Sequence, residues 1–242
     1  MFHASSERFV SVRLRSNHLL PYVGLGYATE AEVVDVNLNL YKDQILPRLQ
    51  DKVMSRKGTR EVRQRVCTGL AGDVVEVGFG TGLNLPFYPV EVSRIFAVEP
   101  SRVCMRLAGD RIARSNVPVD LVGLTGEHLD LPTDTFDAVL STWTMCTIPK
   151  LDDALDEMHR VLKPGGTLHF VEHGHAPDHI TALWQRRFEP LNRRLAGGCH
   201  LTRNVPDYLQ RAGFHIENLN CYYFEKEPKP FGYTFEGIAS KV

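Results

Sequence analysis

The segment Asp73-Val-Val-Glu-Val-Gly-Phe-Gly-Thr-Gly-Leu-Asn84 joins a short apolar run to three glycines at alternate positions. The apolar run has the length of a buried strand, and its one internal acid, Glu76, lies two residues before Gly78. Because glycine has no Cβ atom, a backbone built from Gly78, Gly80 and Gly82 can turn sharply and let a ligand approach closely. The segment therefore predicts a cofactor site at the carboxyl end of a first parallel strand.

The spacing of the glycines narrows the class of cofactor. Dinucleotide sites space them as G-x-G-x-x-G, and P-loops end in Gly-Lys-Ser/Thr. Here the spacing is G-x-G-x-G, and residues 73–91 contain no lysine or arginine. An acid beside the loop suits a ligand that carries positive charge or an amine. S-adenosylmethionine carries both, as a sulfonium and an α-amino group.

The segment resembles motif I of the class I S-adenosylmethionine-dependent methyltransferases, in which an acid and any residue precede G-x-G-x-G. Further resemblances to this family follow in the family's order up to residue 168, at 94–99, 126–132, 136–141 and 160–168. The resemblance implies an α/β fold with a Rossmann-like, doubly wound and mostly parallel seven-stranded sheet. It also implies an antiparallel C-terminal hairpin, and S-adenosyl-L-methionine as the cofactor.

The same resemblance implies roles for individual residues. Glu99 ends the second strand and corresponds to the acid that holds the ribose hydroxyls, whereas Glu76 would meet the methionine amine. Tyr41, on an N-terminal helix, would lie over the cofactor as part of a lid. The predicted cofactor-binding residues are Tyr41, Glu76, Gly78, Gly80, Gly82, Glu99, Pro100, Met105, Gly126, Glu127, His128, Ser141 and Thr142.

The region after the fifth strand supplies the predicted acceptor site. In this family that loop faces the methyl acceptor, so His173 is the predicted base or polar wall. The spacing of His173, His175 and His179 is one residue too long for a known zinc motif, and we expect no metal. Predicted substrate-binding residues are Cys146, His173, Trp184, Cys199 and His200.

From about Tyr41 to its end, the chain resembles the methyltransferase-like 7 group, whose members methylate alkyl thiols. The matching features are Glu172-His173, Trp184, Pro190 and residues 198–203, with Cys146 after the fourth strand. The resemblance implies a small, fairly apolar acceptor, and a thiol fits best because its own acidity supplies thiolate near neutral pH.

Several alternatives to a thiol acceptor stay open. Within the methyltransferases, these are O-, N- or C-methylation of a phenol, a quinol or a lipid head group. The cofactor half also resembles ubiquinone/menaquinone-type methyltransferases. Outside the methyltransferases, the alternatives are a nicotinamide-dependent oxidoreductase and a non-catalytic cofactor-binding module.

Composition limits the partners and the compartment. With 242 residues, 43% hydrophobic and 24% charged, the chain predicts one α/β domain with elaborations. The formal net charge of −1 predicts no nucleic-acid partner. Five scattered cysteines without a C-x-x-C pair favour a reducing compartment, and we expect a cytoplasmic location. Residues 181–195 form a basic amphipathic segment that is a candidate for peripheral contact with an anionic membrane surface.

The chain divides into an extension and a methyltransferase domain. Residues 1–29 are expected to be an N-terminal extension that need not be ordered, and residues 30–242 the domain. Within the domain we expect lid helices at 30–68 and an acceptor-site elaboration at 173–205. Local patterns add four expectations: an apolar packed stripe through Leu38, Tyr41, Ile45 and Leu49, a bend or helix end at Pro47, an N-cap at Thr59, and a kink or break at Pro190.

Overall fold

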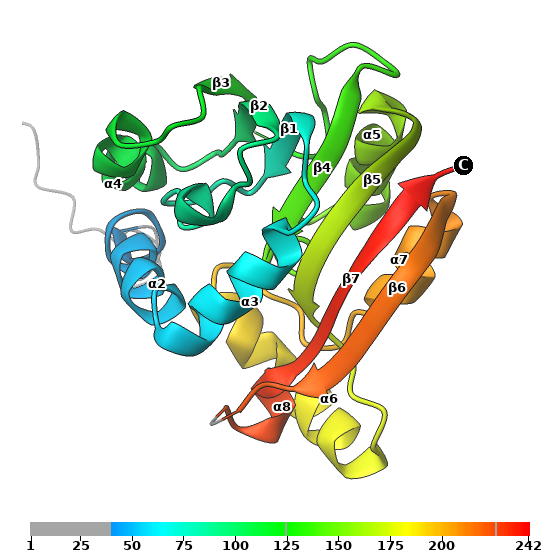
Figure 1. Cartoon of the computed structure of the whole chain (residues 1–242). Coiled ribbons are helices and arrows are strands. Elements are labelled where there is room, and N and C mark those ends of the chain that lie inside the picture. The colour runs from blue at the N-terminus through cyan, green and yellow to red at the C-terminus, as the bar shows by residue number, and fades with distance from the viewer. Residues whose placement is uncertain (1–39, 124, 226) are drawn as a thin grey trace, which may run out of the picture.

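The computed structural model describes residues 40–123, 125–225 and 227–242, so the predicted extension 1–29 and Leu38 lie outside the described residues. Its strands are β1 (Gly72–Val77), β2 (Val92–Val98), β3 (Val119–Gly123), β4 (Phe136–Thr142), β5 (Leu162–His173), β6 (Phe214–Tyr223) and β7 (Tyr233–Lys241). They form one seven-stranded sheet in the order β3-β2-β1-β4-β5-β7-β6 (Figure 1).

The pairing of the strands confirms the predicted fold class. All pairs among β1 to β5 are parallel, whereas β7 pairs antiparallel with both β5 and β6. This is the mostly parallel, seven-stranded sheet with an antiparallel C-terminal hairpin. The parallel arrangement brings the carboxyl ends of β1, β2, β4 and β5 to one edge of the sheet, where a doubly wound fold binds its ligand.

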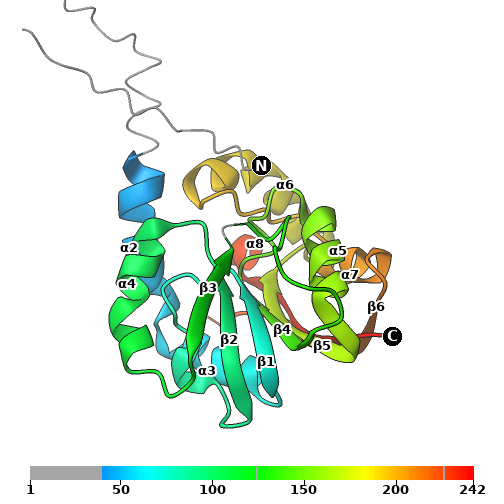
Figure 2. The same ribbon diagram turned by 90° about the horizontal axis from the view of Figure 1, so that it is seen from above.

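Helices cover both faces of this sheet. They are η1 (Tyr41–Ile45, a π-helical turn), α2 (Leu46–Met54), α3 (Lys57–Cys67), η2 (Leu85–Phe87, a 3-10 turn), α4 (Arg102–Ala113), α5 (Leu151–Val161), α6 (His179–Leu195), α7 (Val205–Arg211) and α8 (Lys229–Gly232). Figure 2 shows α4 and α5 on opposite sides of the sheet. Within the described ranges, no helix has the length and apolar character needed to cross a bilayer.

Alternating side chains of β1 divide the core into two layers. Val75 and Val77 pack with apolar residues of α5 and α7, whereas Val74 packs with Val62 and Val66 of α3 on the other face. Since both faces of β1 are covered, the strand needs apolar residues at nearly every position. Among the buried residues of β1, Glu76 is the exception.

The apolar stripe of residues 151–163 predicts a helix that runs to Lys163, but the structure differs at the end of α5. The helix ends at Val161, and Leu162 already pairs with Phe136 in the sheet. Pro164 explains the early end, because its ring disfavours helical backbone at the preceding residue. Gly165 then takes a left-handed conformation, with φ of +77°, before the strand resumes its pairing at Thr167.

The predicted packed stripe of the N-terminal helix is wrong in its described part. Ile45 and Leu49 are 53% and 49% exposed, whereas Leu46 is 6% exposed. The π-helical turn η1 changes the number of residues per turn, so the buried face no longer follows the 3.6-residue period. Pro47 does not end the helix, because it lies in the first turn of α2, where no amide donor is needed.

A predicted helix cap and a predicted helix break are also wrong, for simple geometric reasons. Thr59 does not cap α3, because the helix begins two residues earlier at Lys57 and the Thr59 hydroxyl donates to the carbonyls of Met54 and Arg56. Pro190 does not divide α6, which runs unbroken to Leu195. Pro190 is exposed, so water can bond to the carbonyl that lacks its helical partner.

Candidate active site

The glycine loop after β1 has a left-handed backbone at all three glycines, with φ of +80°, +59° and +74° at Gly78, Gly80 and Gly82. A Cβ atom at Gly78 would lie 2.0 Å from the hydroxyl of Thr144, so this glycine lets the loop after β4 pack closely. At Gly80 the nearest atom would be the carbonyl oxygen of Gly78, 3.8 Å away. Gly80 therefore faces open space and is the point where a ligand can approach the backbone.

Glu99 connects this loop to the start of α4. Its carboxylate accepts hydrogen bonds from the backbone N–H groups of Gly80 and Ser101, each at 2.8 Å. Burial raises the pKa of Glu99, and the two backbone donors oppose that rise. A carboxylate offers about four acceptor positions, so two of them are left for ligand hydroxyls.

Glu76 lies fully buried beneath the loop. Asn84 and Tyr88 each donate to one of its oxygens at 2.7 Å. Burial raises the pKa of this carboxyl to about 7, although both hydrogen bonds oppose the rise. In this structure Glu76 therefore fixes the chain that follows the glycines, and its predicted contact with a ligand amine stays a prediction.

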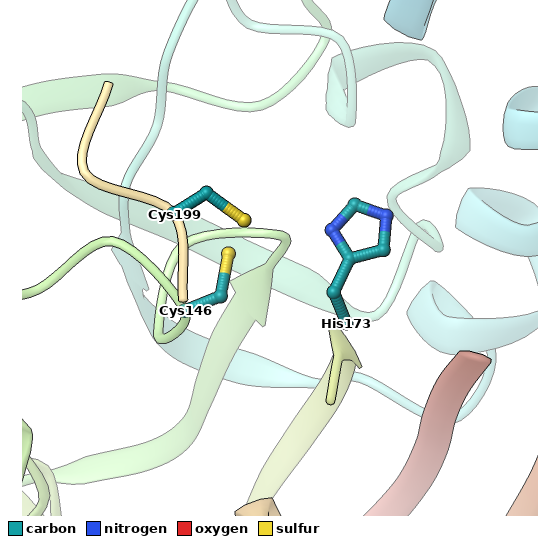
Figure 3. A group of neighbouring side chains, drawn as sticks. All are labelled: Cys146, His173 and Cys199. Carbon is teal, nitrogen blue, oxygen red and sulfur yellow. The ribbon is translucent and has the colours of Figure 1, made fainter. Parts of the chain in front are cut away.

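The second half of the site is a cluster formed by Cys146, His173 and Cys199. Their sulfur and ring-nitrogen atoms lie within 4.8 Å of one another. Figure 3 shows the two sulfurs pointing toward each other and the imidazole turned toward them. Cys146 follows β4, His173 ends β5, and Cys199 lies in the loop after α6, so three distant segments meet at the same edge of the sheet.

The three groups change one another's acidity. A hydrogen bond with Cys146 lowers the pKa of Cys199 to about 5; burial opposes this shift and His173 reinforces it. Burial alone would lower the pKa of His173, but its interactions with Cys199, Glu172 and Glu227 together outweigh burial and raise it. The hydrogen bond with Cys199, together with burial, raises the pKa of Cys146. The cluster can therefore hold a thiolate beside an imidazolium.

Glu172 organises the loop that carries Cys146. Its fully buried carboxylate accepts from the backbone N–H groups of Thr144, Met145 and Cys146 at 2.7, 2.8 and 3.2 Å. From the other side Arg203 donates to the carbonyl oxygens of Met145 and Ile148. The sequence indicated Glu172 only as part of a resemblance, and its role in fixing this loop becomes visible only in the structure.

Comparison with known proteins identifies the family. Residues 75–170 match the family model described as a methyltransferase domain. The chain is 30% identical to the human thiol S-methyltransferase TMT1B over 192 residues, which cover 77% of this chain and 76% of the human one. This chain belongs to the class I S-adenosylmethionine-dependent methyltransferases.

Two further comparisons agree with this assignment. The rat thiol S-methyltransferase TMT1B is 33% identical over 162 residues, which cover 65% of this methyltransferase and 64% of the rat protein's length. The crystal structure of the [4+2]-cyclase SpnF superimposes with a TM-score of 0.62 at 21% identity, covering 76% of this chain and 80% of that one. The SpnF likeness concerns the fold alone.

The residues present fit the cofactor of this family. In the methyltransferase, Gly80 provides a backbone with no side chain in front of it, and Glu99 provides acceptors beside it. Gly126 is buried against Val77 and Ile148, and a Cβ there would lie 3.0 Å from Val77. Met105 is half-buried in the layer below the loop. Of the other predicted cofactor residues, Pro100 and His128 are exposed, Glu127 is half-buried, and Ser141 and Thr142 are buried at the end of β4.

The predicted lid helices of the methyltransferase are bonded both to the glycine loop and to α6. Asp51 of α2 accepts hydrogen bonds from Arg111 of α4 at 2.8 Å and from Thr81 of the glycine loop at 2.5 Å. Tyr41 donates to the carbonyl oxygen of Leu195 at the end of α6. The N-terminal helices therefore connect the cofactor loop with the acceptor side, and contact between Tyr41 and the cofactor stays a prediction.

Arg63 is a functional candidate that sequence reasoning missed. It is buried on α3, donates to Asn84 at 2.7 Å and Thr142 at 2.9 Å, and lies over the ring of Trp143. Burial lowers its pKa to about 10, with Glu76 opposing. No sequence pattern indicated a role for Arg63, because an arginine in a basic helix is expected to be exposed. Its position places a permanent cation between the cofactor loop and β4.

Two predicted acceptor residues, Trp184 and His200, are not part of the cysteine–histidine cluster. His200 bonds to Glu189 of α6 at 2.8 Å. Trp184 is 46% exposed and stacks on Phe188, with 5.5 Å between ring centroids. Leu191 and Leu195 of α6 are also about half-exposed, beside the exposed arginines of the helix. Acceptor contacts by Trp184 and His200, and membrane contact by α6, stay predictions.

The buried carboxyl of Glu76 predicts a pH dependence of stability. Its folded-state pKa of about 7 lies above that of an exposed glutamate, so the folded state holds a proton that the unfolded state has lost. Its contribution to the free energy of unfolding is therefore greatest at low pH and falls as pH rises toward 7, by at most about 1.4 kcal/mol per unit. Denaturant melts of the parent and Glu76→Gln between pH 5 and 8 measure the difference. If the free energies of unfolding of the parent and Glu76→Gln change with pH in the same way, the raised pKa of Glu76 is contradicted.

Proposed function

We propose that this methyltransferase transfers a methyl group to the sulfur of a small, fairly apolar thiol. The observation that carries the proposal is the meeting of Cys146, His173 and Cys199 next to the cofactor loop. The naming of two relatives, at 30% and 33% identity, as thiol S-methyltransferases supports the same acceptor class.

The loop geometry explains how the chain would bring donor and acceptor together. Thr144 packs on Gly78, and Cys146 follows Thr144 by two residues. The acceptor cluster therefore lies next to the glycine loop in space. Glu172 and Arg203 hold this loop from both sides. Fixed alignment of two reactants can lower a barrier by roughly 7–11 kcal/mol. When bound, S-adenosylmethionine supplies an electrophilic methyl group on a sulfonium.

The reaction requires little acid–base catalysis from the protein. The acceptor sulfur forms the new bond to the methyl carbon, the bond between that carbon and the donor sulfur breaks, and the thiol proton goes to water. Because the ordinary pKa of a thiol is about 8.5, a useful fraction is thiolate near neutral pH without a strong base. The chain's contribution is binding, alignment and exclusion of water.

A panel of acceptors tests the proposal. Thiols, phenols, quinols and amines of similar size are incubated with the enzyme and S-adenosylmethionine, and S-adenosylhomocysteine is measured. We expect turnover with thiols and a rate that rises with pH toward the acceptor's own pKa. A more acidic thiol should reach its plateau at a lower pH. Turnover with a phenol, quinol or amine but with no thiol would overturn the proposed acceptor.

A further inference from the structure

The cluster of Cys146, His173 and Cys199 has the composition and spacing of a metal site. The spacing of His173, His175 and His179 in the sequence predicts no metal site. In the structure His173 instead meets two cysteines, and all three potential ligand atoms fall within 4.8 Å of one another. Two thiolates and one imidazole form a donor set that zinc binds in enzymes that keep a fourth position open.

The distances between the three potential ligand atoms need only a small change to fit a tetrahedral zinc ion. Bonds of about 2.3 Å to sulfur and 2.0 Å to nitrogen place neighbouring ligands of a tetrahedral zinc roughly 3.5 Å apart. Side-chain rotation can supply the contraction from 4.8 Å, because the two sulfurs and the imidazole already face one another (Figure 3). Cys146 and Cys199 are 1% and 8% exposed. Two thiolates balance the charge of a divalent cation, so the ion and its three ligands together carry no net charge.

The backbone around both cysteines is held before any ion binds. The carbonyl oxygen of Cys146 accepts from the N–H of His200, and that of Cys199 accepts from the Asn192 amide, each at 2.8 Å. The N–H of Cys146 donates to Glu172. Such surrounding bonds orient metal ligands and raise affinity. The two cysteine-bearing loops are bonded directly to each other through His200.

We propose that Cys146, His173 and Cys199 bind one zinc ion, with its fourth position open. Binding releases the thiol protons that the two cysteines still carry, because zinc takes thiolate ligands. On the basis of the proposed function, the open position receives the sulfur of the acceptor thiol, whose proton is released to water, and holds it as a thiolate beside the cofactor loop. His173 is then a ligand of the ion, in place of the base predicted from the sequence.

Cobalt(II) titration of the full-length protein tests the site without acceptor or cofactor. The protein is reduced, stripped of metal with a chelator, freed of chelator and titrated anaerobically with cobalt chloride alone. We expect one equivalent to bind, with a thiolate-to-cobalt charge-transfer band and the intense visible bands of a tetrahedral site. Zinc chloride should displace the cobalt and remove these bands. Elemental analysis of protein purified without chelator should show zinc bound.

Single substitutions define the ligands. Cys146→Ser, Cys199→Ser and His173→Ala should each weaken cobalt binding by at least about 100-fold, since even neighbours of metal ligands contribute 10- to 100-fold. Cys221→Ser is the matched control, because Cys221 is an exposed free cysteine on β6, and it should bind as the parent does. Circular dichroism checks that each variant is folded.

Two results would overturn the metal site. One is folded, reduced parent protein that shows no charge-transfer band and retains no zinc. The other is a band that survives in folded Cys146→Ser and Cys199→Ser. Cobalt binding without turnover of any thiol would instead support the metal site and contradict the proposed acceptor. Failure of the metal site and failure of the proposed function are therefore distinguishable.

Discussion

Replacement of Gly80 by valine is expected to weaken binding of S-adenosylmethionine by at least about 100-fold, or about 2.7 kcal/mol. The new side chain would occupy the open space in front of the glycine loop, where the nearest atom now lies 3.8 Å from a Cβ position. Isothermal titration calorimetry of the parent and the variant measures the change. The effect follows from the inference that this space belongs to the cofactor.

Gly165→Val is the matched control for backbone strain. Gly165 also has a positive φ, +77°, and no atom lies within 4 Å of its Cβ position. It lies in the turn that begins β5, at the opposite edge of the sheet from the glycine loop. Both variants should lose stability, because valine is strained at positive φ, but only Gly80→Val should lose the cofactor. Equal affinity in both variants would place the cofactor elsewhere.

Glu99→Ala is expected to raise the dissociation constant for S-adenosylmethionine by roughly 30- to 1,000-fold. The carboxylate is the predicted partner of the two ribose hydroxyls, and losing two charge-assisted bonds costs about 2–4 kcal/mol. The substitution also removes the acceptors of the Gly80 and Ser101 N–H groups. Calorimetry should therefore be combined with a denaturant melt of each protein.

Ser101→Ala separates loss of cofactor contacts from loosening of α4. The Ser101 hydroxyl caps this helix by accepting from the N–H of Cys104 at 3.2 Å. Its removal should cost about 1 kcal/mol of stability and leave cofactor affinity close to that of the parent. If Glu99→Ala binds the cofactor as tightly as Ser101→Ala does, Glu99 is not a cofactor ligand.

The meeting of the glycine loop with Glu99 could be predicted from the sequence because its signals are local. The apolar run of β1, the alternate glycines and Glu99 at the end of β2 each lie within one short segment, and parallel pairing brings them together. The structure adds what each glycine does: Gly78 admits Thr144, whereas Gly80 faces open space. That distinction depends on packing between β1 and the loop after β4, which a linear pattern does not contain.

The acceptor half could be predicted only in part, because its residues meet through tertiary structure. Cys146, His173 and Cys199 were named individually from a family resemblance, but their convergence requires α6 to return the chain to the carboxyl ends of β4 and β5. Arg63 was missed for the same reason, since its partners lie on other elements. The buried face of α2 differs from the predicted one, because the π-helical turn η1 interrupts the 3.6-residue period that the prediction assumed.

Transfer of a labelled methyl group to a thiol tests the central claim most directly. The enzyme is incubated with methyl-deuterated S-adenosylmethionine and an alkyl or aryl thiol, and the products are identified by mass spectrometry. We predict a deuterated methyl thioether formed in equal amount to S-adenosylhomocysteine, and none with Gly80→Val. Enzyme that binds the cofactor yet forms no labelled thioether with any thiol in the panel would contradict the assignment of sulfur as the acceptor atom.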